Sequence, residues 1–303
     1  MPDLGLARQK GVTVDINVVI QTVVSALTSS AIYILVALGF TLVFGVMRIV
    51  NFAHGAAFTA GAYGMYVLGT NAGLPYVLSV VLTVVVVTMA AAAIEVGLVE
   101  RTASDGLKTM IMTLGVSLLV VGAIEVAFGA SPVSVPPVVS GSLDVGPAVV
   151  PKDRVLVVVV SLVVLALLWA FLKYGKWGQA LRAVSQDATM AAAHGIRVKW
   201  VRALGFGGAA GLAALAATLI APVLFSTPYV GDEMLVKSFM IVIIGGVGSV
   251  PGVVLAGLLV GFVESVTTVY WDSSIAGIVT FSVVILVLLA TPNGLLGRSS
   301  ARV

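Results

Sequence analysis

The chain has 303 residues, of which 60% are hydrophobic and only 10% are charged, and it contains no cysteine. A soluble domain carries about 25% charged residues, so this composition excludes a water-soluble fold and predicts an integral membrane protein. Without cysteine the chain has no disulfide, no thiolate metal site and no cysteine nucleophile. The formal net charge of +3 is small, and nothing in its distribution indicates nucleic-acid binding.

Apolar runs follow one another along the chain and leave no stretch polar enough to fold in water. A spanning helix needs about 20 apolar residues, and dividing the runs at glycine, proline and polar clusters predicts about eight membrane segments. Their expected ranges are 17–46, 50–70, 76–99, 109–130, 153–173, 201–222, 235–263 and 273–292. We therefore expect an all-α, polytopic integral membrane helix bundle in which residues 1–303 form a single transmembrane domain.

The first predicted segment follows Arg8 and Lys10, as the apolar core of a signal peptide follows its basic start. Residues 16–47 carry no charge and are far longer than a signal core, so we expect them to remain as the first membrane segment. The first and seventh segments are long enough to be broken or paired half-helices, including re-entrant ones. The valine-rich run Val155–Val164 resembles a strand, but its neighbours have helix length, which favours a helix.

A polar interruption at residues 45–55 separates the first two segments and contains Asn51, His54 and Gly55. Corresponding interruptions in the two halves of a transporter are typical of a central solute site, so these three residues are candidates for the substrate pathway. Asn51 and His54 offer hydrogen bonds to a polar solute. The alternative is that both side chains satisfy backbone groups freed at a helix end.

The connection between the fifth and sixth segments is the most basic part of the chain. It contains one acidic residue, Asp187, and six basic ones: Lys173, Lys176, Arg182, Arg197, Lys199 and Arg202. Positive charge favours the cytoplasmic side, so this connection is predicted to be cytoplasmic, with residues 100–108 on the same side and residues 130–151 on the outer side. Interfacial tryptophans at 169, 177 and 200 flank the connection and agree with this orientation.

Residues 174–200 also predict a short cytoplasmic helix. Leu181, Val184, Ala188 and Ala191 recur near helical spacing, and Gly195 is suited to end the helix. The alternative interpretation is an ordinary basic loop lying near anionic lipid.

A second break lies within the seventh segment, where glycines and a proline interrupt an apolar run. Such residues break a helix and free backbone groups, which is tolerated in a membrane only inside protein or beside a cavity. The spacing of Gly248 and Gly252 is equally typical of close helix packing, so packing and pathway lining both stay open. The candidate pathway residues here are Gly245, Gly246, Gly248, Ser249 and Gly252.

Few ionisable residues lie in or near the predicted segments, namely Glu95, Glu125, Lys237 and Glu264. A charge at the centre of a bilayer costs about 2.5–3.5 kcal/mol, so each is expected near a segment end or facing other helices, and Glu95 is expected to pair with a nearby Lys or Arg. Counting segments places both termini outside, whereas Arg298 and Arg302 favour a cytoplasmic C-terminus. A re-entrant segment within 235–263 would remove this conflict.

Several kinds of site are missing from the sequence. It has no G-x-x-x-x-G-K-[ST] phosphate loop, no H-E-x-x-H zinc motif and no G-x-S-x-G nucleophile turn. Catalytic residues and a metal site are therefore not expected, and any coupling to ATP needs another polypeptide.

The run from Ala37 to Gly55 resembles the first-half signature of permease subunits of branched-chain amino-acid-type ABC importers, in particular the LivH-like group. Residues 182–196 resemble the loop of that family that docks on the ATPase, and residues 245–252 resemble its second-half glycine signature. Phe128-Gly129 and the ending at residues 292–297 are also similar. The resemblance covers nearly the whole chain, and the family also includes urea and short-chain amide permeases.

The resemblance implies a multi-pass subunit of a bacterial-type cytoplasmic membrane that forms half of a pathway for branched-chain or related amino acids. Its implied partners are a second permease subunit (LivM-like), two cytoplasmic ATPases that bind ATP and Mg²⁺, and an extracytoplasmic solute-binding protein; this chain binds no cofactor itself. Residues 174–200 correspond to the ATPase-docking loop, with Arg182, Ala183, Asp187, Ala191, Gly195 and Ile196 as docking residues. A urea or amide permease is the nearest alternative, and a stand-alone secondary transporter or channel is the alternative from another class.

Overall fold

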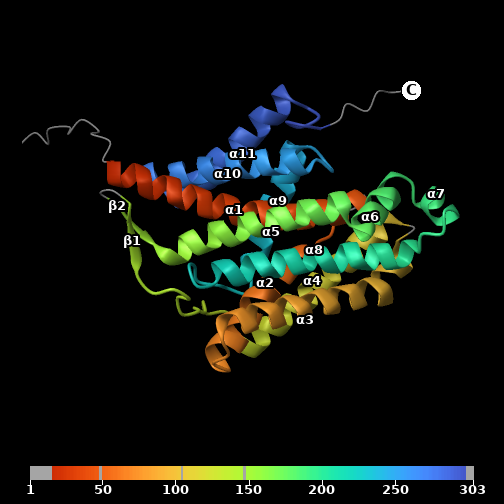
Figure 1. Ribbon diagram of the computed structural model, residues 1–303, viewed down its shortest axis with the longest axis horizontal. Coiled ribbons are helices and arrows are strands. Elements are labelled where there is room, and N and C mark those ends of the chain that lie inside the picture. The colour runs from red at the N-terminus through yellow and green to blue at the C-terminus, as the bar shows by residue number, and fades with distance from the viewer. Residues whose placement is uncertain (1–15, 48–49, 104, 146–147, 298–303) are drawn as a thin grey trace, which may run out of the picture.

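The computed structural model describes residues 16–47, 50–103, 105–145 and 148–297, and this part of the chain is mostly helical (Figure 1). Arg8, Lys10, Arg48, Arg298 and Arg302 lie outside it. The helices are α1 (Ile16–Met47), α2 (Ala53–Met65), the π-helix η1 (Tyr66–Asn71), α3 (Tyr76–Gly97), the 3₁₀-helix η2 (Val99–Thr102), α4 (Gly106–Phe128), α5 (Lys152–Tyr174), α6 (Lys176–Gln186), α7 (Ala188–Ala193), α8 (Val198–Ile220), α9 (Val230–Gly245), α10 (Val250–Tyr270) and α11 (Ser273–Ala290).

Seven of the described helices are long and apolar enough to cross a membrane, namely α1, α3, α4, α5, α8, α10 and α11. The predicted segment 50–70 corresponds to the shorter α2 with its π-helical extension. The valine-rich run lies in α5 and is helical, as expected. The chain is therefore a polytopic helical membrane protein, as its composition predicted.

The two long segments behave differently from each other. The first is an unbroken helix of 32 residues, so the expectation that it is broken was wrong for residues 16–47. The seventh is two helices, α9 and α10, separated at residues 246–249. Helix α9 ends at Gly245 and α10 has Pro251 in its first turn, whereas the described part of the first segment contains only two glycines and no proline.

Helices α9 and α10 form an antiparallel pair. Their backbones touch at Gly245 and Gly252 beside the turn, and Lys237 of α9 meets Glu264 of α10 farther from it. This pair adds one pass, so the described chain begins and ends at opposite ends of the bundle (Figure 1). The seventh predicted segment, 235–263, is therefore two antiparallel helices, and the second of them, α10, is long enough to cross a membrane by itself.

Two helices, α1 and α8, form the centre of the bundle. Helix α10 runs antiparallel to α1 and approaches it where Gly257 and Gly261 face Ile34 and Ser30. Helix α8 contacts α1, α2 and α3. The main hydrophobic core joins these central helices to α9, and most of the large side chains at its centre come from residues 32–40 of α1.

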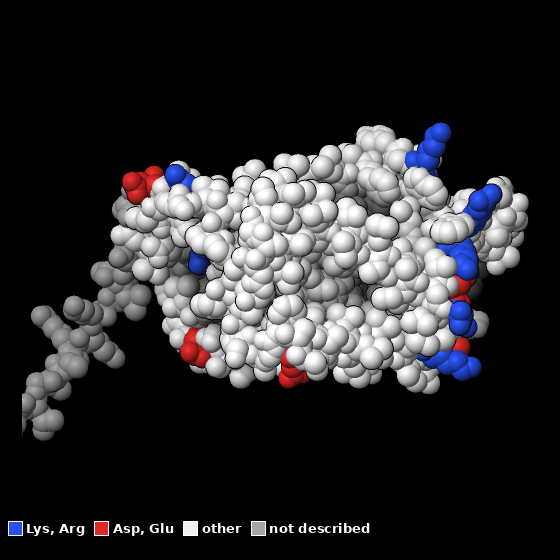
Figure 2. Space-filling model, turned by 90° about the horizontal axis from the view of Figure 1, so that it is seen from below, with Lys and Arg blue, Asp and Glu red and all other residues white. Residues whose placement is uncertain are grey.

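Lys and Arg side chains gather at one end of the molecule, which we call the basic end (Figure 2). It contains η2, the start of α4, the end of α5, α6, α7 and the start of α8. A contact of 3.5 Å between Arg202 and Glu100 joins α8 to the α3–α4 connection. The basic connection and residues 100–108 therefore lie at the same end, as the sequence predicted.

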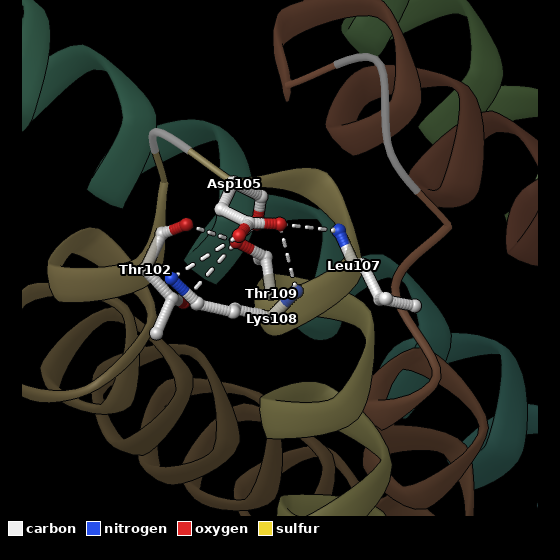
Figure 3. A network of polar contacts seen from close by, with 5 residues as sticks. All are labelled: Thr102, Asp105, Leu107, Lys108 and Thr109. Atoms are coloured by element: carbon white, nitrogen blue, oxygen red, sulfur yellow. Dashed lines mark hydrogen bonds and ion pairs between the residues drawn. The ribbon is translucent and has the colours of Figure 1, made fainter.

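The α3–α4 turn at the basic end is closed by side chains (Figure 3). Asp105 Oδ1 accepts hydrogen bonds from the backbone N–H groups of Leu107 (3.1 Å) and Lys108 (3.2 Å), which caps the start of α4. Thr109 Oγ1 donates to the carbonyl oxygen of Thr102 at 2.7 Å. The capped turn fixes where the two helices meet.

The opposite end carries a feature that the sequence did not predict. Within the expected outer loop, β1 (Ser142–Val145) and β2 (Ala148–Pro151) form a two-stranded antiparallel hairpin that leads into α5 (Figure 1). A bridge between Val133 and Ser226 ties the same loop to the connection after α8. The loop is thus anchored at two points.

Candidate functional site

The first break is built around the start of α2. Asn51 Oδ1 accepts a hydrogen bond from the backbone N–H of Ala53 at 3.0 Å, and Thr113 Oγ1 of α4 accepts one from the N–H of Phe52 at 3.2 Å. The first N–H groups of a helix have no acceptor within the helix, and these two side-chain oxygens serve as their acceptors. Asn51 therefore satisfies a backbone group at a helix end, which was the alternative to a role in binding solute.

His54 lies in the core beneath this break, with 1% of its surface exposed. Its Nε2 lies 3.0 Å from the carbonyl oxygen of Val36 in α1, and a carbonyl oxygen can only accept, so Nε2 donates. The ring also meets Phe40 edge-on, with 5.7 Å between ring centroids. These contacts hold α2 against α1, and His54 borders neither of the two cavities described below.

Gly55 marks a crossing of α2 and α9. A side chain at Gly55 would meet the backbone of Gly231 within 3.0 Å, and one at Gly231 would meet the backbone of Gly55. The N–H of Gly231 also donates to Thr59 Oγ1 at 3.1 Å. Small residues allow two membrane helices to approach this closely, so Gly55 serves packing between the two halves of the chain.

The second break is a tight turn whose polar groups are satisfied by the chain itself. Gly246 and Gly248 have positive φ angles of 92° and 80°, which only glycine adopts without strain. Ser249 caps α10 by accepting from the N–H of Gly252 at 3.2 Å. The C-terminal segment covers the turn, because the N–H of Leu295 donates to the carbonyl oxygen of Ile244 at 2.6 Å.

These observations separate the two breaks. No hydrogen bond among the described residues joins residues 51–55 to residues 245–252, although both belong to one helix bundle. These hydrogen bonds thus do not link the candidate pathway residues of the two breaks to one another. Each break instead has its own local role at a helix end or helix crossing.

A cavity of about 550 Å³ lies between α2, α3, α4 and α8. Among the described residues that line it, Asn51, Tyr63 and Thr83 are the only polar side chains, and none is charged. An amino-acid zwitterion in this cavity would leave both of its charges without a partner, at a large desolvation cost. The cavity therefore does not have the chemistry of an amino-acid site.

A charged cluster inside the bundle was missed at the sequence level. Lys237 Nζ of α9 lies 2.8 Å from Glu264 Oε1 of α10, 2.8 Å from the hydroxyl of Tyr33 in α1 and 2.6 Å from Glu233 Oε1. The Tyr33 hydroxyl donates to Glu264 Oε1 at 2.9 Å. The cluster ties three helices together, and it confirms that Lys237 and Glu264 face other helices.

A signal for this pair was present in the sequence. Lys237 is the only Lys or Arg between Arg202 and Arg298, and Glu264 is the only carboxylate between Glu233 and Asp272. Isolated opposite charges in adjacent apolar segments are expected to find each other. The expected pairing of Glu95 was wrong, because this fully buried carboxylate forms no ion pair in the described residues and Arg202 pairs with Glu100 instead.

The basic connection contains two helices rather than the single one predicted. Helix α6 stops at Gln186, and Asp187 then caps α7 by accepting from the N–H groups of Thr189 (2.8 Å) and Met190 (2.9 Å). As the N-cap of α7, Asp187 has an extended backbone. This conformation is not helical, so α6 cannot continue through Asp187 into α7. Gly195 ends this region with a φ of 82°, as its identity predicted.

The predicted docking residues divide between a surface and a small core. Arg182, Asp187 and Gly195 are exposed, and Ala183 is half-buried. Ala191 is 5% exposed and packs with Leu181, Val184 and Val201, while Ile196 lies against the same cluster. Ala191 therefore faces this small core rather than the surface.

Comparisons with known proteins agree with this architecture. The family described as "Branched-chain amino acid transport system / permease component" matches residues 22–289. The permease LivH of Escherichia coli K12 is 29% identical and BraD of Pseudomonas aeruginosa 30% identical, each over 92% of this chain and 96% of the relative. A probable LivH of Methanocaldococcus jannaschii is 28% identical over 90% of both chains.

No solved structure matches the chain. The family match covers more than half of the sequence and includes both glycine breaks, the charged cluster and the basic connection. The chain therefore belongs to the family of permease components of branched-chain amino acid transport systems.

Proposed function

We propose that this chain is a permease subunit of an ABC importer that carries branched-chain amino acids across a bacterial-type cytoplasmic membrane. The observation that carries the proposal is the family match over residues 22–289. Relatives named as high-affinity branched-chain amino acid permeases support the same solute class. Urea and short-chain amides are the competing solutes within this mechanism.

The proposed complex contains a second permease subunit of the LivM-like type, two cytoplasmic ATPases and an extracytoplasmic solute-binding protein. ATP and Mg²⁺ bind to the ATPases, because this sequence has no phosphate loop. This chain then forms half of the pathway. The basic end faces the cytoplasm by the rule that positive charge remains inside, which places the ATPases beside α6 and α7.

The ATPase contacts the exposed residues Arg182, Asp187 and Gly195, with Ala183 beside them and Ala191 and Ile196 supporting the surface from beneath. The packing of α6 and α7 against α8 supports this role, because Val201 of α8 shares a core with Leu181 and Ala191. A movement of the ATPases would therefore reach a central helix of the bundle. A switch between two states requires contacts that differ between them, and this small core can supply such contacts.

The candidate pathway residues act indirectly, by setting where the helices around the pathway end and cross. They are Asn51, His54 and Gly55 in the first break and Gly245, Gly246, Gly248, Ser249 and Gly252 in the second. Their contacts within the chain support this role. Leu at Gly252 would collide with the carbonyl of Gly245 and is expected to prevent assembly. Leu at Gly248 has open space but an unfavourable positive φ, so it is expected to reduce transport while assembly persists.

The test is uptake of radiolabelled leucine and urea by proteoliposomes that contain this chain and the products of neighbouring genes, with and without ATP. ATP-dependent leucine uptake supports the proposal. Uptake of urea alone keeps the mechanism and changes the solute. Uptake by this chain alone without ATP would overturn the ABC assignment.

Two variants test the docking surface within the same assay. Gly195→Pro and Asp187→Arg are expected to abolish ATP-dependent uptake while membrane insertion is retained, because the first alters the turn after α7 and the second removes its cap. Normal uptake by both variants would exclude this surface from ATPase coupling.

A further inference from the structure

A second cavity, of about 1130 Å³, lies at the basic end between α3, α6, α8 and the connection after α7. Helices α3 and α6 both contact α8. The cavity is bounded by side chains from all three helices. Its lining includes charged side chains, which the described lining of the first cavity does not.

The rim of this cavity carries two cations, Lys176 at the start of α6 and Arg197 just before α8. Both side chains are exposed, and neither forms an ion pair within the described residues. No Asp or Glu is among the described residues that line the cavity. The rim thus presents positive charge without an internal partner, which suits an anionic group.

Two tryptophans stand beside these cations. Trp177 is 54% exposed and Trp200 is 55% exposed, and both line the cavity. Tryptophan concentrates at the boundary between lipid headgroups and acyl chains, because its ring is apolar and its N–H is polar. Their position predicts that this rim lies at the depth of the headgroups.

The floor of the cavity is apolar and continues toward the lipid-facing surface. Ala93 and Val96 of α3 and Leu204 of α8 line it. Ala93 and Leu204 are themselves exposed, as is Met89 one turn away on α3. An occupant must therefore combine an anionic head with an apolar tail.

We propose that this cavity binds one anionic phospholipid of the inner leaflet, with its phosphate between Lys176 and Arg197 and an acyl chain along the floor. Basic pockets between membrane helices on the cytoplasmic side are suited to such headgroups. An acidic segment of a water-soluble ATPase would match the two cations but would leave the apolar floor and the tryptophans without a partner. The lipid would bridge α6 and α8, the two helices that hold the docking surface in place.

The test measures lipid selectivity of the full chain in detergent micelles, in a Trp169→Phe/Trp271→Phe background that leaves Trp177 and Trp200 as the only tryptophans. Brominated phosphatidylglycerol and brominated phosphatidylcholine are titrated separately, and quenching of tryptophan fluorescence reports binding. We expect phosphatidylglycerol to bind more tightly. Lys176→Ala/Arg197→Ala should weaken its binding by roughly fivefold per cation, with little change for phosphatidylcholine.

The matched control is Arg101→Ala/Lys108→Ala, which removes two cations from the same end but outside the cavity. It should retain the preference for phosphatidylglycerol. Ala93→Phe places a large side chain on the floor without adding a tryptophan or removing a charge. It should weaken the quenching by both brominated lipids.

Three results would overturn the proposal. One is equal binding of the two lipids by the parent chain, and another is an equal loss of preference in the control variant. The third is that Lys176→Ala/Arg197→Ala binds both lipids as the parent chain does but no longer co-purifies with the ATPases. That result would assign the two cations to the ATPases. The lipid-binding measurements use the chain without ATP, ATPases or solute, so their outcome does not depend on whether the proposed transport function is correct.

Discussion

Helices α5 and α8 have the same length of 23 residues and are joined by the basic connection, yet they occupy opposite environments. In α8, 72% of the most apolar stretch is buried and its mean hydropathy is 1.8, whereas in α5 only 11% is buried and the mean hydropathy is 3.2. The more hydrophobic helix is therefore the more exposed one. This reverses the rule for soluble proteins, because lipid replaces water outside the bundle.

The difference follows from residue size rather than polarity. Helix α5 is composed largely of Val and Leu, and α8 largely of Ala and Gly. Small residues let backbones approach, as at Gly61, where a side chain would meet the backbone of Ala214 within 3.0 Å. A central membrane helix is thus recognised by its small residues, and a peripheral one by its aliphatic residues.

The largest expected effect is on thermal stability, and it is tested by replacing one alanine with leucine in α8 and, in a separate variant, one alanine with leucine in α5. Ala214→Leu in α8 adds three carbons where the residue is 0% exposed and α2 is in contact, and overpacking of this kind costs about 1–3 kcal/mol or more. Ala166→Leu in α5 adds the same group to an exposed position and should be neutral. Thermal unfolding in detergent, followed by size-exclusion chromatography, measures both; equal effects would contradict the assignment of centre and periphery.

The same contrast explains how much of the fold the sequence predicted. The sequence predicted the helical state of residues 155–164 and the common end of residues 100–108 and 173–202, because both depend on local composition. The central position of α8 was not, because hydropathy ranks it below α5. The unbroken α1 was also beyond prediction, since length alone does not distinguish a long helix from two half-helices.

The second prediction concerns charge, which the central bundle contains and α5 lacks away from its ends. Lys237→Met removes the cation and leaves Glu264 and the Tyr33 hydroxyl without their shared partner. The Tyr33 hydroxyl still donates to Glu264, but the partly buried carboxylate loses its cationic partner. A hydrogen bond to a charged group contributes about 1.5–3 kcal/mol, so the variant should unfold at lower temperature. Lys237→Met/Glu264→Gln should recover part of this loss, and a double variant less stable than the single one would contradict direct coupling.

Candidate site residues were harder to predict than the helices. The Lys237–Glu264–Tyr33 cluster joins residues 27 and 204 positions apart, a proximity that no local pattern reveals. Asn51 and His54 were predicted as pathway residues, and in the structure they form hydrogen bonds with Ala53 and Val36 within the chain. Sequence shows which polar residues are exceptional, and only packing shows whether they face a solute or the backbone.

The third prediction concerns the connection between α5 and α8. Asp187→Ala removes the cap of α7 and should destabilise that short helix by about 1 kcal/mol, because its Thr189 and Met190 N–H groups lose their acceptor. Asp187→Asn keeps an acceptor oxygen and should preserve the helix. Hydrogen exchange of residues 188–193 measures the difference. Equal protection in the two variants would show that the core around Leu181, rather than the cap, holds α7 in place.

The smallest effect is expected at α11, which resembles α5 in having only 17% of its apolar stretch buried. Its start depends on Asp272, whose pKa lies below the usual value because the carboxylate accepts a hydrogen bond from the N–H of Ser274 at 2.7 Å. The stabilisation is complete above the ordinary pKa of Asp, about 3.9, and is lost as the pH falls through the lower folded-state value. Protection of the Ser274 amide should therefore fall on acidification, whereas Asp272→Asn, which accepts at any pH, should show no such change; parallel profiles would mean that packing, not the cap, starts this peripheral helix.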